Sequence, residues 1–381
     1  MAEAVATLNE PAQRNASDSG ERIYVASQWQ LMWWRFRKHK LALVSAVLIF
    51  LFYLVVLFAE FITYSDPLLA NETLSLLPPQ PIHWMDNGQF RPHVYGLTGE
   101  RDRKTFKRVY QPDPAKKIYL RLMATGYAYR LWGLIPANRH LIGVESGQVA
   151  EESIFLLGTD LLGRDLFSRL MIATRTSLTI GLIGVALSLF LGVLLGGISG
   201  LYGGWVDNLI QRVIEVTRSI PTIPLWMALA AALPREWPVT RMYFFITIII
   251  SLIGWTVMAR VVRGRFLSLR GEDFVTAAEL AGASQMRVIF RHMVPSFLSH
   301  IIAATTLAIP AMIISETSLS FLGLGLRAPA MSWGVLLQQA QNIQAIAISP
   351  WLLSPALLVI VAVLAFNFLG DGLRDASDPY G

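Results

Sequence analysis

Residues 271–295 read GEDFVTAAELAGASQMRVIFRHMVP and separate two long apolar runs. Asp273 is suited to cap the N-terminus of a helix, and Gly282 is suited to end one. Most residues between them favour helix formation. We therefore expect two short helices that project from the apolar runs, the second of which ends before Pro295.

Ala277 and Ala278 give the first of these helices a surface of small side chains. Such a surface would let a groove of another protein approach the helix closely. An ordinary amphipathic connector between two apolar segments explains the same residues equally well. The loop alone therefore leaves both interpretations open.

The composition of the chain is that of a membrane protein. Of its 381 residues, 54% are hydrophobic and only 15% are charged, whereas about 25% are charged in a typical soluble domain. The apolar residues form long runs, so we expect an all-α integral membrane protein with six transmembrane helices. The expected spans are Leu41–Ile62, a segment within Ser177–Tyr202, Leu209–Leu233, Met242–Val262, Phe297–Leu319 and Pro350–Gly370.

Basic residues predict the orientation, because cytoplasmic loops carry an excess of Lys and Arg. Four basic residues precede the first span, and arginines crowd the loop between the fourth and fifth. Both termini and that loop are therefore expected on the cytoplasmic side. The expected organisation is a cytoplasmic N-terminal tail (1–40), the first transmembrane helix (41–62), a periplasmic insert (63–170), a five-helix core (171–371) and a cytoplasmic C-terminal tail (372–381).

Several kinds of chemistry are excluded or disfavoured by residues that the chain lacks. It has no cysteine, and its six histidines show no metal-binding spacing, so no metal site is expected. The dipeptide Gly-Lys never occurs, which excludes a P-loop for ATP. The net charge of +6 follows from membrane topology, so nucleic acid is not an expected partner.

The 271–295 loop resembles the permeases of ABC importers, which share the pattern E-A-A-x-x-x-G, nine residues, then I-x-L-P. Here it reads Thr276-Ala277-Ala278, Gly282 and then His292-Met293-Val294-Pro295. Thr276 replaces the acidic residue of the pattern, and His292 replaces the aliphatic one. The resemblance implies coupling helices that dock in a cleft of an ATPase subunit.

A second stretch resembles the dipeptide and oligopeptide permeases, especially their C-type membrane subunit. The sequences Gly158-Thr159-Asp160, Gly163-Arg164-Asp165 and Ser168-Arg169 are similar to their G-T-D-x-x-G-R-D-x-x-S-R stretch. A cluster of Asp and Arg framed by glycine is suited to hold a turn through charge-assisted hydrogen bonds. Contact with substrate and contact with a docked binding protein are the alternatives.

Two further stretches, one with Pro221 and Pro224 and one with Glu316, also resemble this family. Pro221 and Pro224 predict a kink in the third span, which is either a hinge or a static bend. Glu316 lies in or near the end of the fifth span. A carboxylate there either faces a cavity or partner helix, or caps backbone amides at the membrane edge.

Glycines in the second expected span recur at every fourth residue. They are Gly192, Gly196, Gly200 and Gly204. A stripe of this kind predicts close packing against another helix, and lining of a substrate path is the alternative.

The resemblance implies the permease subunit of an importer for short peptides in a bacterial inner membrane. It also implies a heterodimer with a sister permease, two ATPase subunits that hold ATP and magnesium, a periplasmic substrate-binding protein and surrounding membrane lipid. No cofactor is expected in this chain. Oligosaccharides such as α-galactosides are the alternative substrate. A self-contained secondary transporter would need inverted repeats and midplane ionisable sites, and neither is clear in the sequence.

Overall fold

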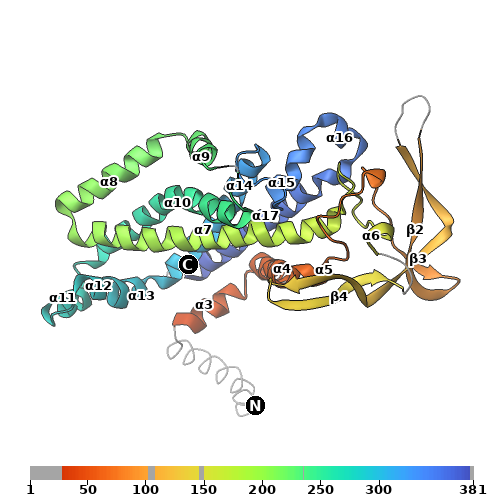
Figure 1. Cartoon of the computed structure of the whole chain (residues 1–381). Helices are drawn as coiled ribbons and strands as arrows, with labels where there is room; N and C mark the ends of the chain where they lie inside the picture. Colours follow the sequence, from red (N-terminus) through yellow and green to blue (C-terminus); the bar gives the residue numbers. More distant parts are fainter. Residues whose placement is uncertain (1–27, 102–107, 146–149, 235, 378–381) are drawn as a thin grey trace, which may run out of the picture.

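The computed structural model describes residues 28–101, 108–145, 150–234 and 236–377, and Figure 1 shows the whole chain. Most of it is helical. Within the described residues, five segments are long and apolar enough to cross a membrane. They are α4 (Lys40–Leu57), α7 (Leu166–Tyr202), α10 (Val239–Leu269), α14 (Leu298–Phe321) and a segment, Pro350–Ser377, that contains α17 (Ser354–Ser377).

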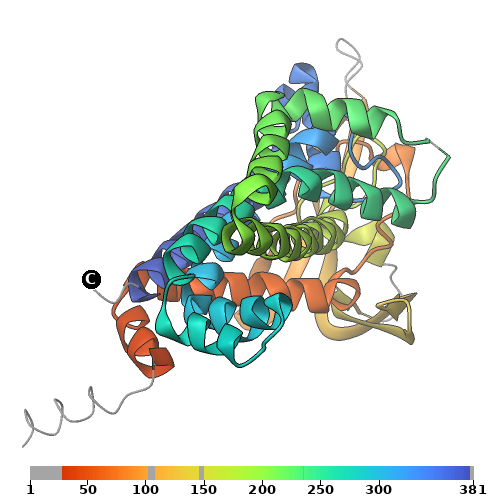
Figure 2. The ribbon, with the colours of Figure 1, turned by 90° about the vertical axis from the view of Figure 1, so that its left-hand side faces the viewer.

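The helix α7 organises the molecule. It has 37 residues, which is roughly 55 Å at 1.5 Å per residue and exceeds the apolar thickness of a bilayer, about 30 Å. The helices α11 to α13 lie near one of its ends and the β-sheet lies near the other (Figure 1). Viewed nearly along α7, α10 lies on one side of it and α4 on the other (Figure 2).

Close contact between α7 and α10 depends on three of the four glycines that were predicted to pack against another helix. A Cβ atom on Gly196 would lie 2.4 Å from the backbone oxygen of Ala259, and one on Gly192 or Gly200 would also collide with α10. The fourth, Gly204, begins the next helix and faces open space, so its predicted packing role is wrong.

The third expected span is not one helix. The amphipathic helix α8 (Gly204–Ser219) ends before an extended residue, Ile220, and a separate ten-residue helix, α9 (Thr222–Ala231), follows. Pro221 precedes α9 and Pro224 lies in its first turn, where a missing N–H group breaks no helical hydrogen bond. The predicted kink within a continuous span is therefore wrong, because the chain leaves the helical conformation there.

The expectation of an all-α chain is also wrong. The insert holds a four-stranded antiparallel sheet, in the order β1-β2-β3-β4. The strands are β1 (His83–Asp86), β2 (Gln89–Arg101), β3 (Arg108–Leu131) and β4 (Ile135–Val144). The first half of β3 pairs with β2 and its second half pairs with β4. The dipeptide Asn87-Gly88, with positive φ angles at both residues, forms the turn between β1 and β2.

Two expected boundaries differ from those of the structure, and short elements complete the fold. The insert ends and α7 begins at Leu166, a few residues earlier than expected, and α17 continues to Ser377, so residues 372–377 are helical. The expected tails at residues 1–27 and 378–381 lie outside the described residues. The short elements are α3 (Gln28–Phe36), α5 (Ala59–Ile62), η1 (Glu72–Leu74), α6 (Ala150–Ser153), α11 (Asp273–Leu280), α12 (Gln285–Arg287), η2 (Val288–Met293), α13 (Val294–Ser296), α15 (Trp333–Gln338), η3 (Gln339–Gln341), α16 (Ile343–Ile348) and η4 (Pro350–Leu353).

The α7–α10 contact predicts unequal effects of adding one methyl group. Gly196→Ala should lower the free energy of unfolding by about 1–3 kcal/mol, because backbone atoms of Ala259 occupy the space. Gly264→Ala on α10 is the matched control, since its Cβ would meet nothing within 4 Å. It should be neutral or stabilising by up to about 1 kcal/mol, because alanine favours helix. Denaturation of the purified variants in detergent measures both, and equal effects would contradict close packing at Gly196.

Candidate functional site

The predicted Asp and Arg cluster forms a closed network ahead of α7. The Asp160 carboxylate accepts backbone N–H groups of Leu162, at 2.8 Å, and Arg164, at 3.0 Å. The side chains of Arg164 and Gln339 donate to its second oxygen at 2.8 and 3.1 Å, and Arg169 Nε lies 3.5 Å from that oxygen. Burial alone would raise the pKa of Asp160, but the hydrogen bonds and charges of Arg164 and Arg169 hold it below its usual value.

Asp165 joins this network to the insert. Its side chain caps α7 by accepting the Ser168 N–H group at 2.7 Å, and it accepts the Tyr64 hydroxyl at 2.8 Å. Burial raises the pKa of Asp165 from 3.8 to about 6. A carboxyl group with a raised pKa in the fold stabilises it less as the pH rises through this interval. Asp165 therefore contributes least to stability above pH 6.

The remaining residues of the cluster allow close approach of the backbone. Gly158 and Gly163 have positive φ angles, and a Cβ atom on Gly163 would lie 1.8 Å from the backbone oxygen of Asn71. The Thr159 hydroxyl accepts the Leu77 N–H group at 2.8 Å. These contacts tie the insert and α7 together. We call residues 158–169 the clamp, and its geometry is that of a structural turn.

The 271–295 loop folds as two helical segments. Glu272, one residue earlier than expected, is the N-cap residue of α11. Gly282 ends that helix with a φ of +78°, and Ala283 N–H donates back to the Ala278 oxygen at 3.0 Å. The second segment passes through the π-helical turn η2 into α13, so the helix does not stop before Pro295 as predicted.

A buried cluster joins this loop to the long helices. Val275 of α11 packs with Val288, Ile289 and Met293 of the second segment, and all four are almost fully buried. The same cluster includes Phe266 and Val262 of α10, Val193 of α7 and Ile301 of α14. A displacement of α11 would therefore act on the packed ends of three membrane-spanning helices.

The outer face of α11 is exposed and partly apolar. Leu280 is 85% exposed, Phe274 is also exposed, and Thr276 and Ala277 lie on the same short helix with exposed side chains. Ala278 is half-buried. His292 is half-buried and Pro295 is exposed on the second segment. Leu280, Phe274 and Ala277 thus give this projecting helix an apolar surface that the described chain leaves open.

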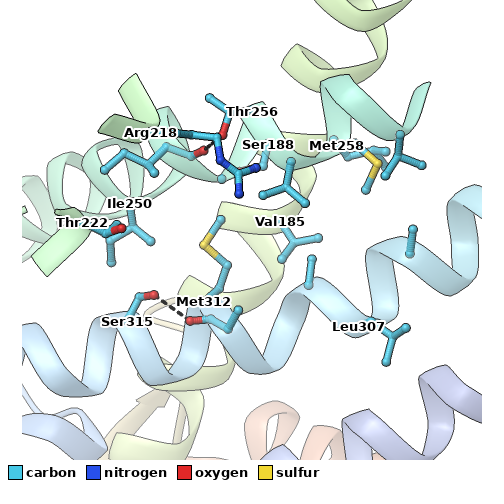
Figure 3. A pocket seen from close by; sticks show the side chains of 18 of the residues that line it. Val185, Ser188, Arg218, Thr222, Ile250, Thr256, Met258, Leu307, Met312 and Ser315 are labelled. Atoms are coloured by element: carbon cyan, nitrogen blue, oxygen red, sulfur yellow. Dashed lines mark hydrogen bonds between the residues drawn. The ribbon is translucent and has the colours of Figure 1, made fainter. Parts of the chain in front are cut away.

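A cavity of about 500 Å³ opens between α7, α8, α9, α10 and α14. Its wall is mostly apolar, and of the described residues that line it Arg218 alone is charged. Figure 3 shows the Arg218 side chain directed inward, among Ser188, Val185 and Met312. Thr222 and Trp226 of α9 also line it, so the helix break beside Pro221 shapes this wall. Such a cavity can take an apolar ligand that carries a negative group.

Glu316 lies inside the protein, between α14 and its neighbours. It is fully buried and accepts the hydroxyl groups of Ser320, at 2.7 Å, and Ser177, at 3.2 Å. These hydroxyls in turn accept the backbone N–H groups of Leu326 and Trp333, each at 3.0 Å. Glu316 thus secures the segment after α14 through two serines and lies away from the cavity wall.

Two family models match the sequence. Residues 192–380 match the binding-protein-dependent transport system inner membrane component. Residues 27–79 match the N-terminal transmembrane domain of oligopeptide transport permease C. An oligopeptide transport system permease protein, OppC, of Bacillus subtilis is 30% identical over 97% of this chain and 96% of its own length.

This chain belongs to the oligopeptide and dipeptide permease family. The resemblance at the clamp and the loop predicted this family, and the prediction is confirmed. The permease protein OppC of Haemophilus influenzae is 39% identical over 60% of this chain and 71% of its own length. A chain of the MetNI methionine ABC transporter matches with a TM-score of 0.42 and 18% identity, over 54% of this chain and 96% of its own, too slight a likeness to support an argument.

Sequence reasoning missed three features of the permease. Leu280 stands out only once its exposure is known, and Arg218 only once α8 and α9 enclose a cavity. Arg263 of α10 donates to Asp207 of α8 at 2.6 Å, which fixes the start of α8. The spacing of 56 residues between that pair gives no local signal.

The clamp predicts a large loss of stability when its central carboxylate is neutralised. Asp160→Asn should lower the free energy of unfolding by about 3–5 kcal/mol, because Arg164 and Arg169 would lose the carboxylate that pairs with both of their buried charges. Glu215→Gln is the control, because the Arg212–Glu215 pair is solvent-exposed. It should cost less than about 1 kcal/mol. Thermal unfolding in detergent measures both losses of stability. A loss for Asp160→Asn no larger than the loss for Glu215→Gln would contradict the stabilising role of the clamp.

Proposed function

We propose that this permease is the C-type membrane subunit of an importer for short peptides in a bacterial inner membrane. The observation that carries the proposal is its similarity, along 97% of the chain, to a protein named as an oligopeptide transport permease. Peptide import is favoured over oligosaccharide import, because the relatives reported above bear oligopeptide names. The importer would also contain a sister permease, two ATPase subunits and a periplasmic substrate-binding protein.

The proposed topology places both termini and the 271–295 loop in the cytoplasm, with the sheet outside. Each of the five long apolar segments overlaps a span expected from the sequence. The helices α8 and α9 take the place of the third expected crossing, and six crossings would require that this broken pair also span the membrane. The opposite placement of α11 and the sheet near the two ends of α7 supports such an arrangement (Figure 1).

Coupling to ATP would pass through α11. Its exposed apolar face supports docking of a partner ATPase, and its buried face rests on the cluster shared with α7, α10 and α14. Closure of the ATPase subunits on ATP would push α11 as a rigid body. Because the cluster is tightly packed, the push would reach the long helices. Their movement would change the side of the membrane to which the translocation path is open.

The assignment is tested with the complete importer in proteoliposomes. The permease should co-purify with an ATPase, and the assembly should import a labelled tripeptide only in the presence of ATP and the binding protein. An α-galactoside should not be imported under the same conditions. Uptake without ATP would contradict the importer, and uptake of the sugar but not the peptide would contradict the peptide assignment.

The proposed docking face predicts a selective defect. Leu280→Asp should cut peptide-dependent ATP hydrolysis and uptake at least about tenfold, since a buried charge in a protein contact costs more than 1.4 kcal/mol. Leu68→Asp is the matched control, because Leu68 is also an exposed leucine but lies in the insert. It should leave the ATPase rate unchanged. Normal coupling in Leu280→Asp, with normal amounts of permease in the membrane, would remove α11 from the mechanism.

A further inference from the structure

The hairpin between β3 and β4 ends in an apolar tip that the rest of the described chain leaves uncovered. Trp132 is 48% exposed, Leu134 is 78% exposed and Ile135 is 53% exposed. The turn is tight, with Gly133 N–H donating to the Arg130 oxygen at 3.0 Å. Three large apolar side chains at the tip of a hairpin in water would be unfavourable.

This tip lies beside the end of a membrane-spanning helix. The Trp132 indole N–H group donates to the backbone oxygen of Leu57 at 2.8 Å, and Leu57 is the last residue of α4. A second bond, between the hydroxyls of Tyr127 and Thr63, at 2.6 Å, holds the hairpin along α5. In Figure 1 the β3–β4 hairpin runs alongside α5, with its turn near the end of α4.

The neighbouring surface of α4 is exposed and apolar. Phe50 and Leu51 in its middle are both exposed, as are Leu57 and Phe58 at its end. The helix α4 is strongly apolar, and the described chain buries little of its surface, so this surface is available to lipid. The hairpin tip therefore continues an exposed apolar surface at the end of α4.

The backbone and composition of the hairpin agree with this position. Trp132 has a φ of +52°, a backbone conformation that is unfavourable for a bulky side chain. The next residue, Gly133, also has a positive φ, which glycine adopts freely. The tip therefore carries a tryptophan where the turn alone favours asparagine or glycine. Tyr129 and the exposed Arg130 precede the tip in the stem. Tryptophan and tyrosine concentrate where apolar and headgroup layers meet.

We infer that the β3–β4 tip inserts into the lipid bilayer at this boundary and anchors the insert to the membrane. Lipid is what covers the apolar side chains of the tip. The hydrogen bond from the Trp132 indole to Leu57 fixes the position of the tip relative to the end of α4. Trp132, Leu134 and Ile135 would then meet acyl chains while Arg130 reaches the headgroups. The inference depends neither on the transported substrate nor on which side of the membrane holds the insert.

Because the chain contains no cysteine, single spin labels can test the inference directly. Leu134→Cys is labelled in the assembled importer in liposomes, and collision rates with oxygen and with a water-soluble nickel chelate are measured. Phe90→Cys is the matched control, since Phe90 is 71% exposed beside the β1–β2 turn of the same sheet. The label at 134 should collide with oxygen at least about threefold more often relative to nickel than the label at 90.

Two outcomes would overturn the inference. Equal, high nickel collision at both positions would place the tip in water. An immobilised label at 134 that neither reagent reaches would show that a protein, rather than lipid, covers the tip. Trp132→Phe, which removes the indole N–H group and keeps a smaller aromatic ring, provides a second readout. It should move the label at 134 to a different depth while the label at 90 stays unchanged.

Discussion

Direct backbone contact between α7 and α10 is the constraint on which the rest of the permease depends. Three glycines let the two helices approach until atoms of Met258, Ala259 and Phe266 fill the places where Cβ atoms would lie. In a bilayer the hydrophobic effect does little to hold helices together, so such close van der Waals contact is a major source of association. The pair then acts as a rigid frame. At one end of this frame, Phe266 packs in the buried cluster that includes Val275 of the 271–295 loop. At the other end, the clamp leads into α7.

The clamp and the loop cluster stabilise opposite ends of this frame by different physics. At the clamp, buried charges compensate each other around Asp160, and the cost of removing one is high. At the loop, aliphatic side chains such as Val275 and Ile289 are packed without charge. Close packing at the loop would transmit a displacement of α11 to the long helices, whereas the hydrogen-bonded clamp holds its turn in one geometry.

The sequence predicted much of the frame, because long apolar runs and a glycine every four residues follow from membrane physics. It also predicted short helices in the 271–295 loop and an Asp–Arg turn at residues 158–169, which the structure contains. The sheet was missed although Asn87-Gly88 is a strong hairpin signal, because the surrounding strands carry many charges and prolines. The break at Ile220–Pro221 could not be separated from a kink, since the neighbours of α9 decide between them. The exposure of Leu280 and the cavity around Arg218 depend on the packed structure and leave no pattern in the sequence.

We propose that a partner ATPase rests on α11 and acts on the α7–α10 frame through it. Attachment of a thiol-linked photo-crosslinker at Ala277→Cys tests it most directly, because the chain has no other cysteine and Ala277 is exposed. Illumination of the assembled importer should join the permease to an ATPase subunit, with a yield that changes when ATP is added. Crosslinking at this position only to lipid or to the periplasmic binding protein would contradict the account.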